Sequence, residues 1–252
     1  MTSSRPAARR LDLDVTEVGH GEQLVVFVHG VLDRGRSFAR VAELLDAECR
    51  MVWYDRRGYG AATGAPGAPA DVEAHVDDLL AVLDGRRAVV VGHSFGGVTV
   101  LGAALRAPEH FDATVLYETG MAWAPGWDDR ALQTFLWRDD AAEAGLRMML
   151  GPRFESLTAE QVERRIPQGW AFVVEERAVR TGEPPFDLSG LAVPLVYGVS
   201  DHYPMTGVLD FLRAQVPGVE IVTIVGGGHN AHRATPEAFA DLVRRGMALA
   251  GR

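Results

Sequence analysis

Residues 92–96, Gly-His-Ser-Phe-Gly, have the types and spacing of a nucleophile turn. They match the pattern G-x-S-x-G, with an apolar run directly before them and a helical pattern directly after. Glycines two positions to either side of Ser94 allow the chain to turn sharply, which would expose a strained serine hydroxyl. The pattern predicts that Ser94 attacks a substrate carbonyl carbon. The alternative is an ordinary glycine-rich turn between a strand and a helix.

A serine hydroxyl is a weak nucleophile at neutral pH, so it needs a base, which a carboxylate must orient. His229 lies in the loop GGGHNAH after one apolar run, and Asp201 follows the preceding apolar run. The carboxyl ends of parallel strands meet at one sheet edge, where open α/β sheets place their sites. We therefore predict His229 as the base, in preference to His232, and Asp201 as the acid.

Other titratable residues are given supporting or structural roles. Glu118 ends an apolar run and is the reserve acid, although shaping the pocket or capping a turn is the role we expect. His93 is expected to pack beside the nucleophile. His75 and Asp78 lie near each other on a predicted helix without a clear third ligand, so we expect a solvated helix face and no metal.

Short β-branched runs alternate with amphipathic stretches, which predicts an α/β fold whose parallel sheet has helices on both faces. Asp71 is expected to cap one helix, and residues 94–105 and 235–249 read as two more. The predicted strands are Leu11–Val18, Leu24–His29, Arg50–Asp55, Ala88–Gly92, Ala113–Glu118, Val193–Val199 and Val219–Val225.

Residues 121–191 interrupt this alternation with helical, partly apolar sequence. They hold four of the five tryptophans: Trp123, Trp127, Trp137 and Trp170. We interpret 121–191 as a helical cap inserted into a core domain formed by 1–120 and 192–252. The tryptophans would line the pocket or form the cap's own core.

Composition excludes several function classes. A formal charge of −9 with no basic stripe argues against a nucleic-acid partner. All 25 basic residues are arginines, which excludes lysine Schiff-base and pyridoxal chemistry and is typical of a GC-rich bacterial source. The single cysteine, Cys49, cannot form an internal disulfide, which is compatible with the cytoplasm.

Neither the first ten residues nor any apolar run suggests membrane insertion. The first ten residues carry three arginines without a following apolar segment, so we expect no secretory signal. No run approaches the length of a membrane span.

An edge strand or the cap offers a surface for a homodimer.

Ser94, Asp201 and His229 in this chain order, together with His29-Gly30 and the turn 55–60 (DRRGYG), resemble the α/β-hydrolase superfamily, in its serine esterase and cofactor-free haloperoxidase-like branch. The resemblance implies a mostly parallel sheet of the eight-stranded type and a structural role for the turn. It also implies an oxyanion hole made by the backbone N–H groups of Val31 and Phe95, each worth roughly 3 kcal/mol in the transition state. Relatives that open epoxides or displace halide use an aspartate at the position of Ser94.

The expected function is hydrolysis of a carboxylic ester, lactone or thioester through a serine acyl-enzyme, without cofactor or metal. The expected substrate is a small molecule with a small to medium apolar or aromatic acyl group. The expected walls hold no arginine cluster, so nothing there indicates that the substrate must carry a negative charge. Perhydrolase or haloperoxidase-like chemistry, carbon–carbon bond cleavage or lyase activity, and a non-catalytic ligand receptor stay open as alternatives. The expected substrate-binding residues are His29, Gly30, Leu32, Met121 and Trp123.

Overall fold

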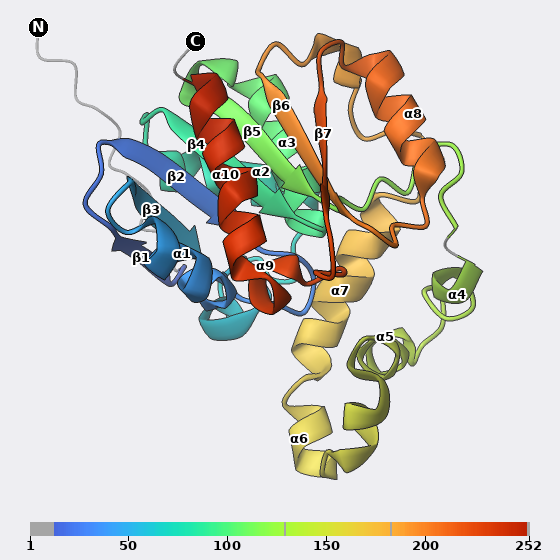
Figure 1. The fold of residues 1–252 in the computed structure, drawn as a ribbon. Helices are drawn as coiled ribbons and strands as arrows, with labels where there is room; N and C mark the ends of the chain where they lie inside the picture. Colours follow the sequence, from blue (N-terminus) through green and yellow to red (C-terminus); the bar gives the residue numbers. More distant parts are fainter. Residues whose placement is uncertain (1–12, 129, 182, 251–252) are drawn as a thin grey trace, which may run out of the picture.

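A seven-stranded sheet organises the described part of the chain, which in this computed structural model comprises residues 13–128, 130–181 and 183–250 (Figure 1). Its strand order is β1-β3-β2-β4-β5-β6-β7, and only the edge strand β1 runs antiparallel to its neighbour. The strands are β1 Val15–Val18, β2 Gln23–Val28, β3 Cys49–Tyr54, β4 Ala88–His93, β5 Phe111–Tyr117, β6 Leu195–Ser200 and β7 Glu220–Ile224.

Helices cover both faces of the sheet, as the alternating sequence predicts. Helices α1 and α10 pack on one face, and α2, α3 and α8 pack on the other (Figure 1). Successive strand residues alternate between the two cores, so that Val26 faces α2 and α3 whereas Phe27 faces α1 and α10. The helices of these layers are α1 Ala39–Leu45, α2 Val72–Leu83, α3 Phe95–Arg106, α8 Thr206–Gln215 and α10 Pro236–Ala250, with the short α9 Ala231–Ala234 preceding α10.

The predicted α/β fold and its parallel sheet are confirmed. All seven predicted strands are present with ends shifted by a few residues, and Leu11 and Asp12 of the first lie outside the described residues. The described part of the chain contains seven strands rather than the eight of the full superfamily sheet. The side chain of Asp71 accepts a hydrogen bond from the N–H of Ala74 and caps α2 as predicted.

Residues 121–191, called the cap segment below, contain helices between β5 and β6 that project from the carboxyl edge of the sheet (Figure 1). A small separate cluster, including Phe135, Leu136 and Phe172, packs α5 against α7. Val31 and Leu32, in the loop after β2, pack against that cluster. The helices are α4 Arg130–Gln133, α5 Ala141–Leu150, α6 Ala159–Glu163 and α7 Ile166–Ala178.

The four tryptophans of the cap segment have different surroundings. Trp123 and Trp127 pack against the main core, and their indole N–H groups have no hydrogen-bond partner in the described structure. Trp170 packs against the cap cluster, whereas the side chain of Trp137 is exposed beside Arg177. Of the four, Trp170 has the position expected for a residue of the cap's own core, and none lines the cleft described below.

A buried ion pair ties helix α7 to the core. Arg56, in the turn after β3, donates to Glu175 of α7 across 2.6 Å, and both side chains are fully buried. The Tyr59 hydroxyl donates to the same carboxylate at 2.8 Å. Arg56 also donates to the carbonyl oxygens of His29 and Gly30. The turn after β3 thus holds the cap helix and the loop after β2 in one arrangement.

His75 and Asp78 differ from the expected solvated helix face. Both side chains are buried. His75 Nε2 lies 2.8 Å from Glu175, and Asp78 forms an ion pair with Arg57. The helix pattern showed their shared face, but the partners come from distant parts of the chain.

No helix in the described ranges combines the length and the apolarity that crossing a bilayer requires.

Candidate active site

Ser94 lies at a strained turn between β4 and α3. Its backbone has φ +52° and ψ −126°, and its N–H donates to the carbonyl of Tyr117 on the neighbouring strand. The flanking glycines are required by close packing: a β-carbon on Gly96 would come within 2.2 Å of the Val28 carbonyl oxygen, and one on Gly92 within 2.6 Å of Gly97. The strained serine predicted from the sequence is therefore present, with its side chain half-buried.

His229 is hydrogen-bonded to a carboxylate through Nδ1. Its partner is Glu118, whose Oε2 lies 2.7 Å away. The other carboxylate oxygen of Glu118 accepts from the backbone N–H and the hydroxyl of Ser200. Burial opposes ionisation of Glu118, but the bonds from His229 and Ser200 outweigh it and lower the pKa of this carboxyl. An ionised Glu118 therefore orients the imidazole and leaves Nε2 for another partner.

The expected acid, Asp201, does not contact His229. Its Oδ1 accepts from the backbone N–H of Gly226 at 3.2 Å, so the side chain is turned toward the loop after β7. Strand order gives the physical reason. Glu118 follows β5, the direct neighbour of the strand that carries Ser94, whereas Asp201 follows β6, one strand further away. The reserve acid of the sequence analysis thus takes the place expected for Asp201.

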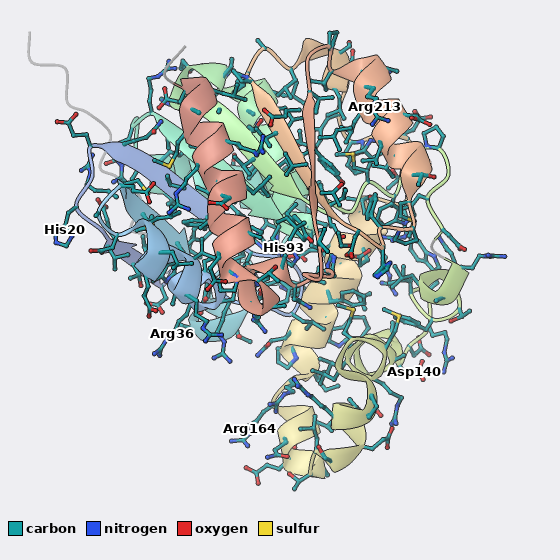
Figure 2. All side chains as sticks on the ribbon, viewed as in Figure 1. His20, Arg36, His93, Asp140, Arg164 and Arg213 are labelled. Atoms are coloured by element: carbon teal, nitrogen blue, oxygen red, sulfur yellow. The ribbon has the colours of Figure 1, made fainter. Side chains whose placement is uncertain are left out.

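Two hydrogen bonds from the sheet fix the loop that carries His229. The Tyr117 hydroxyl donates to the carbonyl of Gly228 at 2.7 Å, and His93 Nε2 lies 2.8 Å from the carbonyl oxygen of His229. Burial, together with the nearby His232 and His229, holds the pKa of His93 well below its ordinary value, so this ring is neutral and donates. His93 is buried directly before the nucleophile, as expected, and its ring lies 4.6 Å from that of His232 in α9; Figure 2 labels His93.

His93 lies beside both Ser94 and His229 in the described structure. The rings of His93 and His229 are 4.8 Å apart between centroids, and His93 directly precedes Ser94. No hydrogen bond joins Ser94 to His229 in the described ranges. Catalytic hydrogen bonds are often long without substrate and shorten when it binds.

The two backbone N–H groups expected to form the oxyanion hole are free of protein acceptors in the described ranges. Phe95 is the first residue of α3, so its N–H points out of the helix start. Val31 follows Gly30, and a β-carbon on Gly30 would come within 2.8 Å of Ser94 Cβ. The loop after β2 therefore lies directly beside the serine.

The expected substrate-binding residues divide into two groups. Leu32 lines a cleft and, with φ +50°, is held in a left-handed conformation beside the cap segment. His29 and Met121 are fully buried, Gly30 is buried and Trp123 is half-buried against the main core. Both ring nitrogens of His29 are already engaged, by Gly30 and by the N–H of Arg56. His29 and Met121 are therefore closed off from solvent in this structure, and their substrate contacts stay a prediction.

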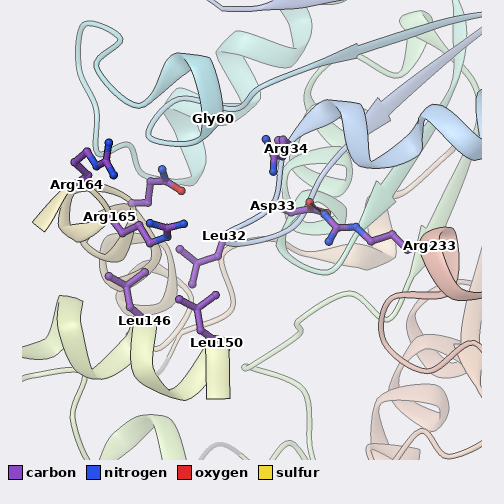
Figure 3. Close-up of a pocket in the computed structure, with 10 residues that line it drawn as sticks. Leu32, Asp33, Arg34, Gly60, Leu146, Leu150, Arg164, Arg165 and Arg233 are labelled. Atoms are coloured by element: carbon purple, nitrogen blue, oxygen red, sulfur yellow. Dashed lines mark hydrogen bonds and ion pairs between the residues drawn. The ribbon is translucent and has the colours of Figure 1, made fainter. Parts of the chain in front are cut away.

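The cleft beside Leu32 has a volume of about 410 Å³ and opens between the core and the cap segment (Figure 3). Leu146 and Leu150 of α5 form its apolar wall. Arginines form much of the rest, although none belongs to the walls expected from the sequence. They were missed because three of the four lie far from Leu32 in sequence: the four are Arg34, Arg164, Arg165 and Arg233.

Asp33, His93 and His232 have ligand atoms within 4.8 Å of one another, a spacing that a metal ion could use. Asp33 already accepts hydrogen bonds from Ser37 and Arg233, and the pKa of His232 is lowered by burial. We interpret this group as structural support beneath the loop of His229.

Comparisons with known proteins agree with the fold. The family model described as "Alpha/beta hydrolase family" matches residues 25–242. A lipase, LipV of Mycobacterium tuberculosis, is 36% identical over 116 residues, which cover 44% of this chain and 43% of the lipase. The mouse serine hydrolase BPHL is 26% identical over 96% of this chain and 85% of its own.

Among solved structures, E-2-(acetamidomethylene)succinate hydrolase superposes with a TM-score of 0.71 at 18% identity, covering 95% of this chain and 98% of that chain. At this identity the likeness concerns the fold alone. The family model spans most of the described chain, and the strained serine and the His229–Glu118 pair lie where its fold meets the cap segment. The chain therefore belongs to the alpha/beta hydrolase family.

Proposed function

We propose that this hydrolase cleaves a carboxylic ester through an acyl-enzyme on Ser94. The hydrogen bond between His229 Nδ1 and Glu118 carries the proposal, because it fixes the imidazole tautomer that leaves Nε2 free to accept the serine proton. Lactones and thioesters react through the same steps and stay within the proposal.

In the first half-reaction Ser94 Oγ bonds to the substrate carbonyl carbon while His229 Nε2 takes its proton. The resulting oxyanion is stabilised by the N–H groups of Val31 and Phe95. The bond to the leaving alcohol then breaks as His229 returns the proton to it, which leaves Ser94 acylated. Water, activated by His229, releases the acid and restores the serine.

We propose that the acyl group of the substrate is small to medium and apolar, because Leu32, Leu146 and Leu150 give the cleft an apolar wall. The cytoplasmic location, the bacterial source and the homodimer also remain proposals from the sequence.

Labelling with a fluorophosphonate probe tests the proposal. Wild type should be labelled, and Ser94→Ala should lose both labelling and roughly 10⁴-fold or more of kcat on p-nitrophenyl esters. Circular dichroism of both proteins controls for folding. A folded wild-type protein that binds the esters without turnover or labelling would instead favour the ligand-receptor alternative.

A further inference from the structure

The cleft between the core and the cap segment is strongly cationic although the chain as a whole is acidic. Four arginines and one acid line it. In Figure 3, Arg164 and Arg165 come from the cap side, whereas Arg34 comes from the loop after β2 and Arg233 from α9 of the core. Guanidinium groups converging from separate elements on one cavity are suited to bind the oxygens of an anion.

Two of these arginines lack a compensating charge. Arg233 pairs with Asp33, and Arg164 lies 4.0 Å from Glu160. Arg165 donates only to the backbone carbonyl of Gln161, and no carboxylate pairs with it or with Arg34 in the ranges that the structure describes. An anion entering the cleft would therefore meet guanidinium groups that are available for pairing.

The cleft is built from the segments that hold the proposed catalytic groups. Leu32 is the residue after Val31, whose N–H is proposed for the oxyanion hole. Arg233 belongs to α9, which begins two residues after His229. A substrate bound at Ser94 could therefore extend along Leu32 into the cleft.

We propose that the substrate carries an anionic oxygen group, a carboxylate or a phosphate, which Arg34 and Arg165 bind at the end of an apolar acyl chain. This inference rests on the proposed ester hydrolysis and names the substrate class of that site. The three leucines contact the chain, and Arg164 and Arg233 add positive potential around the anion.

A matched pair of esters tests the proposal. Mono-p-nitrophenyl adipate and p-nitrophenyl hexanoate have six-carbon acyl chains that differ in the terminal carboxylate. Wild type should have a kcat/KM about tenfold or more higher for the adipate ester, the ratio expected for one charge-assisted pairing. Added salt should reduce this preference, because it screens the attraction.

The double variant Arg34→Gln/Arg165→Gln should lose most of the preference for the adipate ester while its rate on the hexanoate ester stays within about threefold. Arg153→Gln is the matched control, since Arg153 is an exposed cap arginine outside the cleft. Inhibition by adipate and by inorganic phosphate distinguishes a carboxylate from a phosphate on the substrate. The stronger of the two inhibitors identifies which anionic group the arginines bind. Weakened inhibition in the double variant would support the shared chemistry.

The outcomes separate this inference from the function on which it rests. Equal wild-type rates on both esters, or equal losses on both in the double variant, would overturn the anion site while leaving the ester hydrolase intact. No hydrolysis of either ester and no fluorophosphonate labelling would reject the proposed function. Calorimetric titration of Ser94→Ala with adipate then still tests the site: binding that the two arginine substitutions abolish supports it, and no binding overturns it.

Discussion

At the scale of single residues, the site depends on which carboxylate reaches His229. Glu118 does so from the end of β5, and its second oxygen is held by Ser200. The left-handed backbone of Glu118, with φ +44°, turns it out of the strand. A non-glycine residue in this conformation is strained, and such strain is often found at functional sites.

Substitution of the two candidate acids should give opposite results. Glu118→Gln should lower kcat by up to about 10⁴-fold, because an amide neither fixes the correct tautomer nor stabilises the imidazolium. Asp201→Asn should keep kcat within a few-fold, since its side chain bonds Gly226 and not His229. Steady-state kinetics on one p-nitrophenyl ester measures both. The reverse pattern would restore Asp201 as the acid.

The sequence predicted Ser94 and His229 because a local motif and a glycine-rich loop mark them. It favoured the wrong partner for His229, because Glu118 and Asp201 each end a strand. The choice between them depends on two tertiary facts: β5 lies beside β4, and the backbone N–H of Ser200 donates a hydrogen bond to Glu118.

At the scale of elements, helix α7 is the connection between the cap segment and the catalytic loops. Arg56 joins Glu175 of α7 to the carbonyl oxygens of His29 and Gly30, the residues just before the proposed oxyanion donor. Movement of α7 would therefore displace the loop after β2. Periodicity predicted the helices, but this contact spans 119 residues and no local pattern reports it.

Glu175→Gln should destabilise the protein by about 3–5 kcal/mol, because it leaves the Arg56 charge buried without its counter-charge. Glu163→Gln, an exposed glutamate of α6, is the matched control and should change the free energy of unfolding by less than about 0.5 kcal/mol. Urea denaturation measures both. Similar stabilities for the two variants would show that the buried pair does not hold the cap segment.

At the scale of the whole molecule, buried histidines connect folding to pH. Burial lowers the pKa of His29 to about 3, and it also lowers the pKa values of three more buried histidines: His75, His93 and His232. In the unfolded chain a histidine takes a proton near pH 6.5. The unfolded state therefore binds more protons below that pH, which favours unfolding.

The free energy of unfolding should fall as pH is lowered from 7 to 5, by about 2 kcal/mol or more. Each of these histidines contributes up to roughly 1.4 kcal/mol per pH unit below its unfolded pKa. Glu118 and Glu175, whose pKa values are lowered, add to the loss only below about pH 5. Urea denaturation at the two pH values tests this. Unchanged or greater stability at pH 5 would contradict the neutral, buried state of these rings.

The account's central claim is that Ser94 forms the acyl-enzyme. The most direct measurement is rapid acid quenching of the wild-type protein during turnover of a p-nitrophenyl ester, followed by mass spectrometry of the intact protein and its peptides. We predict one acyl group per chain, located on Ser94, with none in Ser94→Ala. An acyl group on another residue, or turnover with no covalent species under conditions that give a p-nitrophenol burst, would contradict it.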